Sequence, residues 1–177
     1  MIANSHPESN LRKLIIRTLC TIVILPLIGL VFTEFYRNYR SQKYFTSKHC
    51  IYNAQHIARG INSYLLDYDG YYPQSSGWMD KVDAYSSKLG EFQFHCSETP
   101  KSQFSYAFNK SLSGKDDDQL GDDYLRSTPM VYESTLMVKN ASDKAASLPM
   151  PPRHPAGNTV AFADGRVKQI KDIDVKK

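Results

Sequence analysis

Several patterns that mark enzymes are missing from this chain. It has no serine-containing nucleophile elbow, no His-Glu-x-x-His pair and no glycine-rich phosphate loop. Only three cysteines occur in 177 residues, and a chain of this length has a core large enough to fold without disulfide staples. We therefore expect one folded domain that is not an enzyme and has no evident small-molecule substrate.

A basic surface is also missing from the C-terminal two-thirds of the chain. Residues 51–177 hold fifteen Lys and Arg against sixteen Asp and Glu, whereas residues 1–50 hold seven against two. The net charge of +4 therefore comes from residues that flank an N-terminal apolar segment. Nucleic-acid binding needs basic side chains gathered on one face of a domain, so we expect no nucleic-acid partner.

What the chain does have is one long apolar run, "LIIRTLCTIVILPLIGLVF", at residues 14–32. Nineteen helical residues rise about 28 Å, close to the roughly 30 Å hydrocarbon core of a bilayer. A cleaved signal peptide would have a shorter run and an A-x-A-like site after it, and buried helices of soluble proteins are rarely apolar throughout. The run predicts a single-pass transmembrane helix at 14–35, after a cytoplasmic tail at 1–13.

The helix is expected to continue beyond the apolar run. No Gly or Pro occurs between Thr33 and Arg59, and apolar residues recur at steps of three and four. Gly70 is suited to end a helix, and Pro73 prevents its resumption. The spacing predicts a helix to about residue 68, with an apolar stripe formed by Ile51, Ala54, Ile57, Ala58, Ile61, Leu65 and Tyr68.

After Pro73 the pattern changes to short β-branched and aromatic runs separated by Gly, Asp, Ser and Pro. The expected strands are 92–96, 105–109, 129–134, 159–163 and 166–170. Asp164-Gly165 between the last two is typical of a two-residue type I′ hairpin, in which Phe162 would face Val167. The whole predicts an α+β fold with a long N-terminal helix packed on a small antiparallel sheet, and residues 36–177 form its extracytoplasmic domain.

The order of these segments carries a family resemblance. An N-terminal apolar helix leads into "CIYNAQHIARGINSYLLDYDGYYP", followed by "FHC", "SYAFN", "TPMVYES" and finally "RHPAGNTVAFADGRVKQI". From Cys50 to Ile170 the chain resembles the pseudopilin-like, prepilin-type proteins of bacterial type II secretion that carry a processing-associated His-x9-Asp-Gly domain. The resemblance implies a pilin-like fold and a structural role beside other pilin-like subunits or secretion machinery. It also implies a place in the cytoplasmic membrane, with the N-terminus inside and the C-terminal domain periplasmic or extracellular.

The N-terminus departs from the pattern of that family. Its members open with a prepilin peptidase signal, a Gly followed by Phe-Thr-Leu-x-Glu and an apolar helix. Here no such motif precedes Leu14, Gly29 is followed by "LVFTE" inside the apolar run, and neither Glu8 nor Glu34 matches the family's glutamate. We therefore keep two hypotheses: an assembling pseudopilin-like subunit, or a signal-anchored extracytoplasmic binding or sensory domain that does not assemble.

The resemblance also implies a disulfide. Family members often carry cysteines at both Cys50 and Cys96, which would lie outside the cytoplasm, where disulfides persist. The alternative is two separate buried thiols. The third cysteine, Cys20, lies within the apolar run.

The His-x9-Asp-Gly motif consists of His154, Asp164 and Gly165. A catalytic pair would need a nucleophile or a third orienting group, and a metal site would need further ligands at suitable spacing. We expect a structural role, in which the His154 ring hydrogen-bonds a carbonyl and Asp164 with Gly165 forms a turn. A metal site and a partner contact are the alternatives.

One acidic stretch, "GKDDDQLGDDY", is the remaining candidate for a metal site. Ca²⁺ prefers carboxylate oxygens, but the stretch lacks the spacing of an EF-hand loop. A solvated loop is the expected structure, with no resident cofactor. Calcium is the alternative, held by Asp116, Asp117, Asp118, Asp122 and Asp123.

Overall fold

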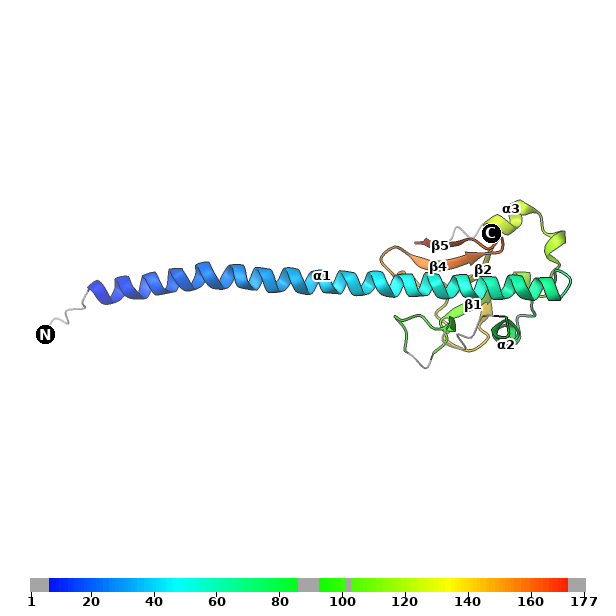
Figure 1. The fold of residues 1–177 in the computed structure, drawn as a ribbon, viewed down its shortest axis with the longest axis horizontal. Coiled ribbons are helices and arrows are strands. Elements are labelled where there is room, and N and C mark those ends of the chain that lie inside the picture. Colours follow the sequence, from blue (N-terminus) through cyan, green and yellow to red (C-terminus); the bar gives the residue numbers. More distant parts are fainter. Residues whose placement is uncertain (1–6, 86–92, 101–102, 172–177) are drawn as a thin grey trace. The chain divides into compact units, whose positions relative to one another are not determined.

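The computed structural model describes residues 7–85, 93–100 and 103–171, and residues 1–6 of the predicted tail lie outside these ranges. The chain divides into two compact units, Met1–Gln42 and Lys43–Lys177. One helix, α1 (Pro7–Asp67), contributes to both units. Figure 1 shows the course of the chain through α1, the short helices and the strands.

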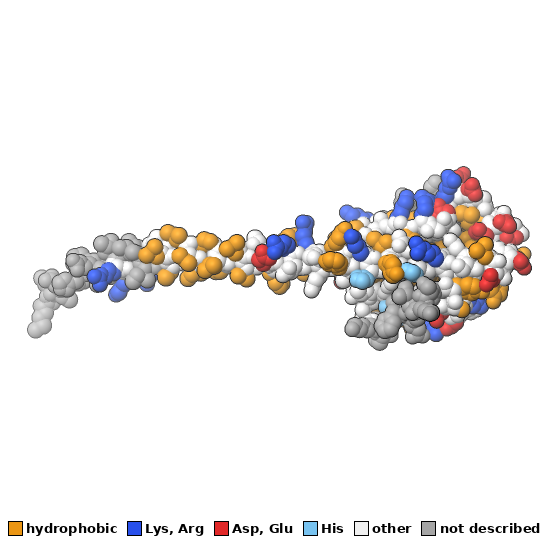
Figure 2. Space-filling model, viewed as in Figure 1, with side chains coloured by type: hydrophobic (Ala, Val, Ile, Leu, Met, Phe, Trp, Pro, Cys, Tyr) orange, Lys and Arg blue, Asp and Glu red, His pale blue; other side chains and the backbone are white. Residues whose placement is uncertain are grey.

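The first unit is an apolar helix without cover. Its large hydrophobic side chains from Leu19 to Phe35 are 50–70% exposed, and Pro26 lies within the helix without ending it. Figure 2 shows hydrophobic side chains along this stretch. Between Arg17 and Asp67 the helix is long and apolar enough to cross a membrane, with a mean hydropathy of 2.1 in its most apolar 18-residue window and none of that window buried.

In the second unit, the predicted apolar stripe of α1 faces the core. Ala54, Ile57 and Ile61 are fully buried, and Ala58 is almost fully buried. Tyr68 is half exposed, and its ring stacks on the Tyr64 ring. The helix ends at Asp67, one residue before the predicted end. The chain then turns with positive φ at Asp69 and Gly70, and the Gly70 N–H donates to the Leu65 carbonyl, which agrees with the predicted stop.

Within the described residues, the sheet has five short strands in the order β3-β1-β2-β4-β5. It is mixed, because β1 pairs with β3 in parallel while the other neighbours are antiparallel. The expected α+β architecture is therefore present, but the expectation of a purely antiparallel sheet was wrong: a two-residue strand without strong apolar patterning adds a parallel edge. The strands are β1 (Tyr106–Asn109), β2 (Pro129–Glu133), β3 (Ser142–Asp143), β4 (Asn158–Phe162) and β5 (Val167–Ile170).

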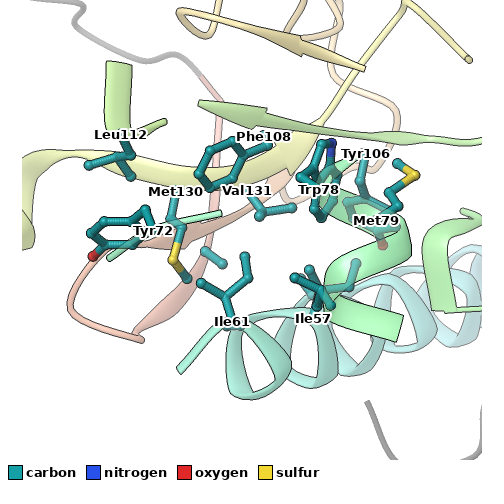
Figure 3. Packing of buried hydrophobic residues seen from close by; sticks show 14 of the residues in the cluster. Ile57, Ile61, Tyr72, Trp78, Met79, Tyr106, Phe108, Leu112, Met130 and Val131 are labelled. Atoms are coloured by element: carbon teal, nitrogen blue, oxygen red, sulfur yellow. The ribbon is translucent and has the colours of Figure 1, made fainter. Parts of the chain in front are cut away.

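The main core lies between α1 and the sheet. Figure 3 shows Ile57 and Ile61 projecting from α1 towards Val131 and Met130 of β2. The Trp78 ring packs against Phe94 and Phe108, and its indole N–H donates to the Ala141 carbonyl over 2.9 Å, so its polar atom is satisfied inside the core. Trp78 begins a short helix, α2 (Trp78–Asp83).

Two local expectations were wrong. Residue 92 of the expected strand 92–96 lies outside the described residues, and Gln93 and Phe94 form a short 3₁₀ turn instead of a strand. The acidic stretch is not one solvated loop, since it forms a 3₁₀ turn (Asp117–Gln119) and a helix, α3 (Asp122–Ser127). Aspartates near the N-terminus of a helix are stabilised by the helix dipole, which favours these short helices.

The final hairpin differs in loop length and register from the prediction. Its loop has three residues, Ala163 to Gly165, with the Gly165 N–H donating to the Phe162 carbonyl and the Phe162 N–H to the Arg166 carbonyl. Ala161, not Phe162, therefore faces Val167. The reason is that the Ala163 N–H donates to the Thr128 carbonyl, which removes Ala163 from the ladder with β5. Gly165, with φ +83°, takes the left-handed position of this longer loop.

The packing of α1 gives the first prediction. Ile57→Ala removes a fully buried side chain from the core and should lower the free energy of unfolding by about 2–5 kcal/mol. Leu66→Ala is the matched control on the same helix, because Leu66 is 86% exposed, and it should change stability by less than about 0.5 kcal/mol. Urea unfolding of the detergent-solubilised chain measures both. Equal effects would contradict the described packing.

Candidate functional site

Four buried side chains with ligand-type atoms converge in the second unit. They are Cys50, Cys96, Glu133 and His154, and their sulfur, carboxylate and imidazole atoms all lie within 4.8 Å of one another. None of the four residues is more than 2% exposed. Each comes from a different part of the chain: α1, the segment 93–100, the end of β2, and the loop before β4. We refer to these four residues as the Cys–Glu–His cluster.

Hydrogen bonds to the backbone at and beside the two cysteines hold both residues in place. The Cys50 carbonyl accepts a hydrogen bond of 3.0 Å from the Tyr106 hydroxyl, and the Cys96 N–H donates to the Ser105 hydroxyl over 2.9 Å. Between the two segments, the Asn53 side-chain amide donates to the His95 carbonyl over 2.8 Å. The segment 93–100 is thus tied to α1 and to the start of β1 by side chains and by one backbone hydrogen bond, from the Ser105 N–H to the Phe94 carbonyl, and not by a strand ladder.

His154 and Glu133 form a buried pair. His154 Nε2 lies 2.9 Å from Glu133 Oε1 and 3.4 Å from Cys96 Sγ, while Glu133 Oε2 accepts from the Thr159 N–H over 3.2 Å. The expectation that the ring would bond a carbonyl was therefore wrong: its partner is a carboxylate. Nδ1 of His154 has no hydrogen-bond partner among the described residues, so the ring acts through Nε2.

The loop before β4 aims His154 at the cluster. The Asn158 side chain accepts from the Arg153 N–H at 3.0 Å and donates to the Pro149 carbonyl at 2.7 Å. The Arg153 guanidinium donates to the carbonyls of Ser105 and Ser134, which flank the paired ends of β1 and β2.

Gly157 completes the same loop. Its N–H donates to the His154 carbonyl over 3.0 Å, and its φ is +124°. A Cβ at this position would lie 2.4 Å from the Ile170 carbonyl oxygen, so only glycine fits beside β5. The sequence "RHPAGN" is therefore a positioning device for one imidazole.

The sulfur atoms of Cys50 and Cys96 lie 2.7 Å apart. This is closer than two thiols normally approach, yet longer than the roughly 2.05 Å of a disulfide bond, and both residues are free thiols in this structure. The fold therefore brings together the two cysteines that the resemblance pairs. The disulfide itself stays a prediction.

The cluster couples the acidity of its members. The hydrogen bond from Cys96 outweighs burial and, with a further one from His154, lowers the pKa of Cys50 to about 6. The same bond to Cys50, together with burial, raises the pKa of Cys96. Burial disfavours the imidazolium, but hydrogen bonds to Cys50 and Glu133 and the negative charge of Glu133 raise the pKa of His154 to about 10. Hydrogen bonding in the cluster therefore favours the thiolate of Cys50 and the imidazolium of His154 over their neutral forms.

The other two residues of the motif lie at the opposite end of β4. The Asp164 carboxylate pairs with Arg166, and the Asp164 backbone N–H donates to the Leu125 carbonyl of α3. A Cβ on Gly165 would approach the Asn62 amide of α1 to 3.3 Å. His154 and Asp164 thus do not form a joint site, and the expectation that Asp164 and Gly165 form a turn is confirmed.

The remaining sequence candidates are not drawn into the cluster. Asp116 accepts hydrogen bonds from the Asp118 N–H and the Gln119 side chain, and Asp117 accepts from the Tyr72 hydroxyl over 2.6 Å. Asp122 and Asp123 lie in the first turn of α3. Over the ranges that the structure describes, these aspartates do not form a convergent group of carboxylates, and calcium binding stays untested.

Glu133 is the functional residue that sequence reasoning missed. It ends a strand whose five residues are all buried, and an acidic side chain in such a run is rarely buried without a partner. That signal was present in "PMVYES", but its significance depends on knowing that the strand is central in the sheet.

Comparison of the chain with protein-family models, with curated proteins and with solved structures gives no match. The structural features that bear on function are the Cys–Glu–His cluster and the uncovered apolar helix.

The buried pair gives the second prediction. His154→Ala leaves the Glu133 carboxylate buried without its imidazole partner and should lower the free energy of unfolding by about 3–5 kcal/mol. His49→Ala is the control, because His49 is exposed on α1, and it should change stability by less than about 0.5 kcal/mol. Thermal or urea unfolding measures both variants. An unchanged unfolding free energy in His154→Ala would contradict a structural role for this histidine.

Proposed function

We propose that this chain is a non-enzymatic, membrane-anchored structural protein of the pseudopilin-like kind. Its apolar helix spans the cytoplasmic membrane with the N-terminus inside, and the unit from Lys43 onward faces the periplasm or the cell exterior. The uncovered apolar helix carries this proposal. Its partners are the membrane and other pilin-like subunits or secretion machinery.

The composition of the first unit supports the anchor. Large apolar side chains from Leu19 to Phe35 are exposed on all sides of a helix, and exposing such a surface to water is costly. Lipid removes that cost without requiring a protein partner. Next to the apolar run, Tyr36 and Tyr39 alternate with Arg37 and Arg40, and the Arg40 side chain lies over the Tyr36 ring. Aromatic and basic residues of this kind gather where a helix leaves the hydrocarbon core.

The build of the second unit supports a structural head. Its most reactive groups, the two thiols and the imidazole, are at most 2% exposed, so a substrate cannot reach them without opening the core. Contacts within the cluster also connect the segment 93–100 to α1 and the loop before β4 to the sheet. Groups placed this way stabilise a fold and are unsuited to turnover at an open surface.

A second candidate is an anchored extracytoplasmic domain that does not assemble. The observation that favours it is the lack of a Gly-Phe-Thr-Leu-x-Glu signal before the apolar run, since that glutamate is the residue through which the family assembles. Cross-linking in intact membranes separates the two: a ladder of homo- or hetero-oligomers supports the assembling subunit, and a single band at the monomer mass supports the lone anchor.

The anchor gives the third prediction. Ile24→Arg places a charge near the centre of the apolar run and should disfavour insertion by about 2.5–3.5 kcal/mol. We expect a large part of this variant to be extracted from membranes by alkaline carbonate, whereas the unaltered chain stays with the lipid. Leu66→Arg, at an exposed position in the second unit, is the control and should stay in the membrane fraction. If Ile24→Arg is retained as fully as the control, the helix is not the anchor.

A further inference from the structure

We propose that the Cys–Glu–His cluster, in its thiol form, is a closed binding site for a thiophilic divalent cation, with Zn²⁺ as the test ion. This site does not depend on the membrane function proposed above. Cys50, Cys96, Glu133 and His154 would each supply one ligand atom.

The donor set fits such a cation. Zn²⁺ in proteins is bound by thiolate, imidazole and carboxylate groups, and its structural sites hold four such ligands in a closed tetrahedron. The cluster offers two sulfurs, one nitrogen and one carboxylate oxygen within 4.8 Å of one another. The nitrogen that faces the other three donors is Nε2, because that atom makes the contacts with Glu133 and Cys96.

The distances require local adjustments. A tetrahedral ion with metal–sulfur bonds of about 2.3 Å and a metal–nitrogen bond of about 2.0 Å places sulfur and nitrogen about 3.5 Å apart. The Cys96 Sγ–His154 Nε2 distance is 3.4 Å. The two sulfurs would stand about 3.8 Å apart in the same tetrahedron, against the 2.7 Å observed, so one cysteine side chain must swing outward by about 1 Å. The His154 Nε2–Glu133 Oε1 distance of 2.9 Å must also widen, to the roughly 3.3 Å that a tetrahedral ion with bonds of about 2.0 Å sets between nitrogen and oxygen.

The surroundings fit the charge of the occupied site. Two thiolates and one carboxylate with a divalent cation carry one net negative charge. The Arg153 guanidinium lies against the carbonyls of Ser105 and Ser134, the latter being the residue after Glu133, and supplies one positive charge nearby. The outer oxygen of Glu133 is already held by the Thr159 N–H, and hydrogen bonds of this kind fix the orientation of metal ligands.

Occupancy by a cation and formation of the Cys50–Cys96 disulfide exclude each other. Oxidation by a low-molecular-weight disulfide takes two electrons from the two thiolates, forms the bond between their sulfurs and releases the cation. The reagent accepts those electrons and two protons and leaves as two thiols. The disulfide keeps neither thiolate, so it cannot hold the ion.

The test uses the full chain in detergent with Cys20→Ser, so that the cluster holds the two remaining cysteines. The protein is reduced with a phosphine in the absence of oxygen. Zn²⁺ is then titrated in competition with a chromogenic chelator. We expect one Zn²⁺ per chain. Cys50→Ser and Cys96→Ser should each weaken binding by more than the roughly 100-fold that losing an outer hydrogen-bond partner can cost. His49→Gln, at an exposed histidine, is the control and should bind like the parent.

Co²⁺ binding to the unaltered cluster covers the case in which the cysteine variants do not fold. We expect a thiolate-to-cobalt charge-transfer band and the visible spectrum of a tetrahedral ion, both lost when oxidised glutathione is added. The proposal is overturned if the reduced, folded protein binds no Zn²⁺, if the bound Co²⁺ shows no thiolate band, or if the disulfide form binds Zn²⁺ equally well.

Discussion

The second unit depends on one surface, the buried face of α1, which meets two kinds of neighbour. Ala54, Ile57 and Ile61 lie against the apolar side of the sheet, and one turn before them Cys50 meets the carboxylate and imidazole of the cluster. Because a helix is stiff over so short a distance, packing of the apolar face sets the position of the Cys50 sulfur. The register of the core and the geometry of the cluster are therefore parts of a single constraint.

The same constraint explains the nine-residue spacing of the histidine and the Asp-Gly pair. His154 meets α1 at Cys50, and Gly165 meets it at Asn62, which is about 18 Å further along the helix. Between these contacts runs β4, whose five residues span about 17 Å. The spacing thus matches a strand that runs beside the helix, with a loop at one end and a turn at the other. His154 and Asp164 lie at opposite ends of β4, too far apart to act on the same group, although the sequence places them in one motif.

Part of the fold and of the cluster follows from the sequence and part does not, and each case has a physical reason. The α1 stripe, the stop near Gly70 and four of the five strands come from local periodicity and turn chemistry. The loop of the last hairpin does not, because the Ala163 N–H is taken by Thr128, a residue distant in sequence. The expected strand at 92–96 fails for the same kind of reason: the His95 carbonyl and the Cys96 N–H are satisfied by side chains of Asn53 and Ser105. In the sequence, Glu133 resembles an ordinary polar residue near the end of a strand. Its burial follows only from the position of that strand within the sheet.

The composition of the cluster argues that it does more than fill space. Apolar side chains of similar volume stabilise a core at least as well as a buried ion pair, which must first lose its hydration. Here a carboxylate and an imidazole are nevertheless buried beside two thiols, and Arg153, Gly157 and Asn158 hold that arrangement in place. Either proposed chemical form, disulfide or metal site, would join α1 to the segment 93–100, and the metal form would also bind the loop before β4 and the end of β2. The chemistry of the two cysteines would then determine how firmly the sheet is held on α1.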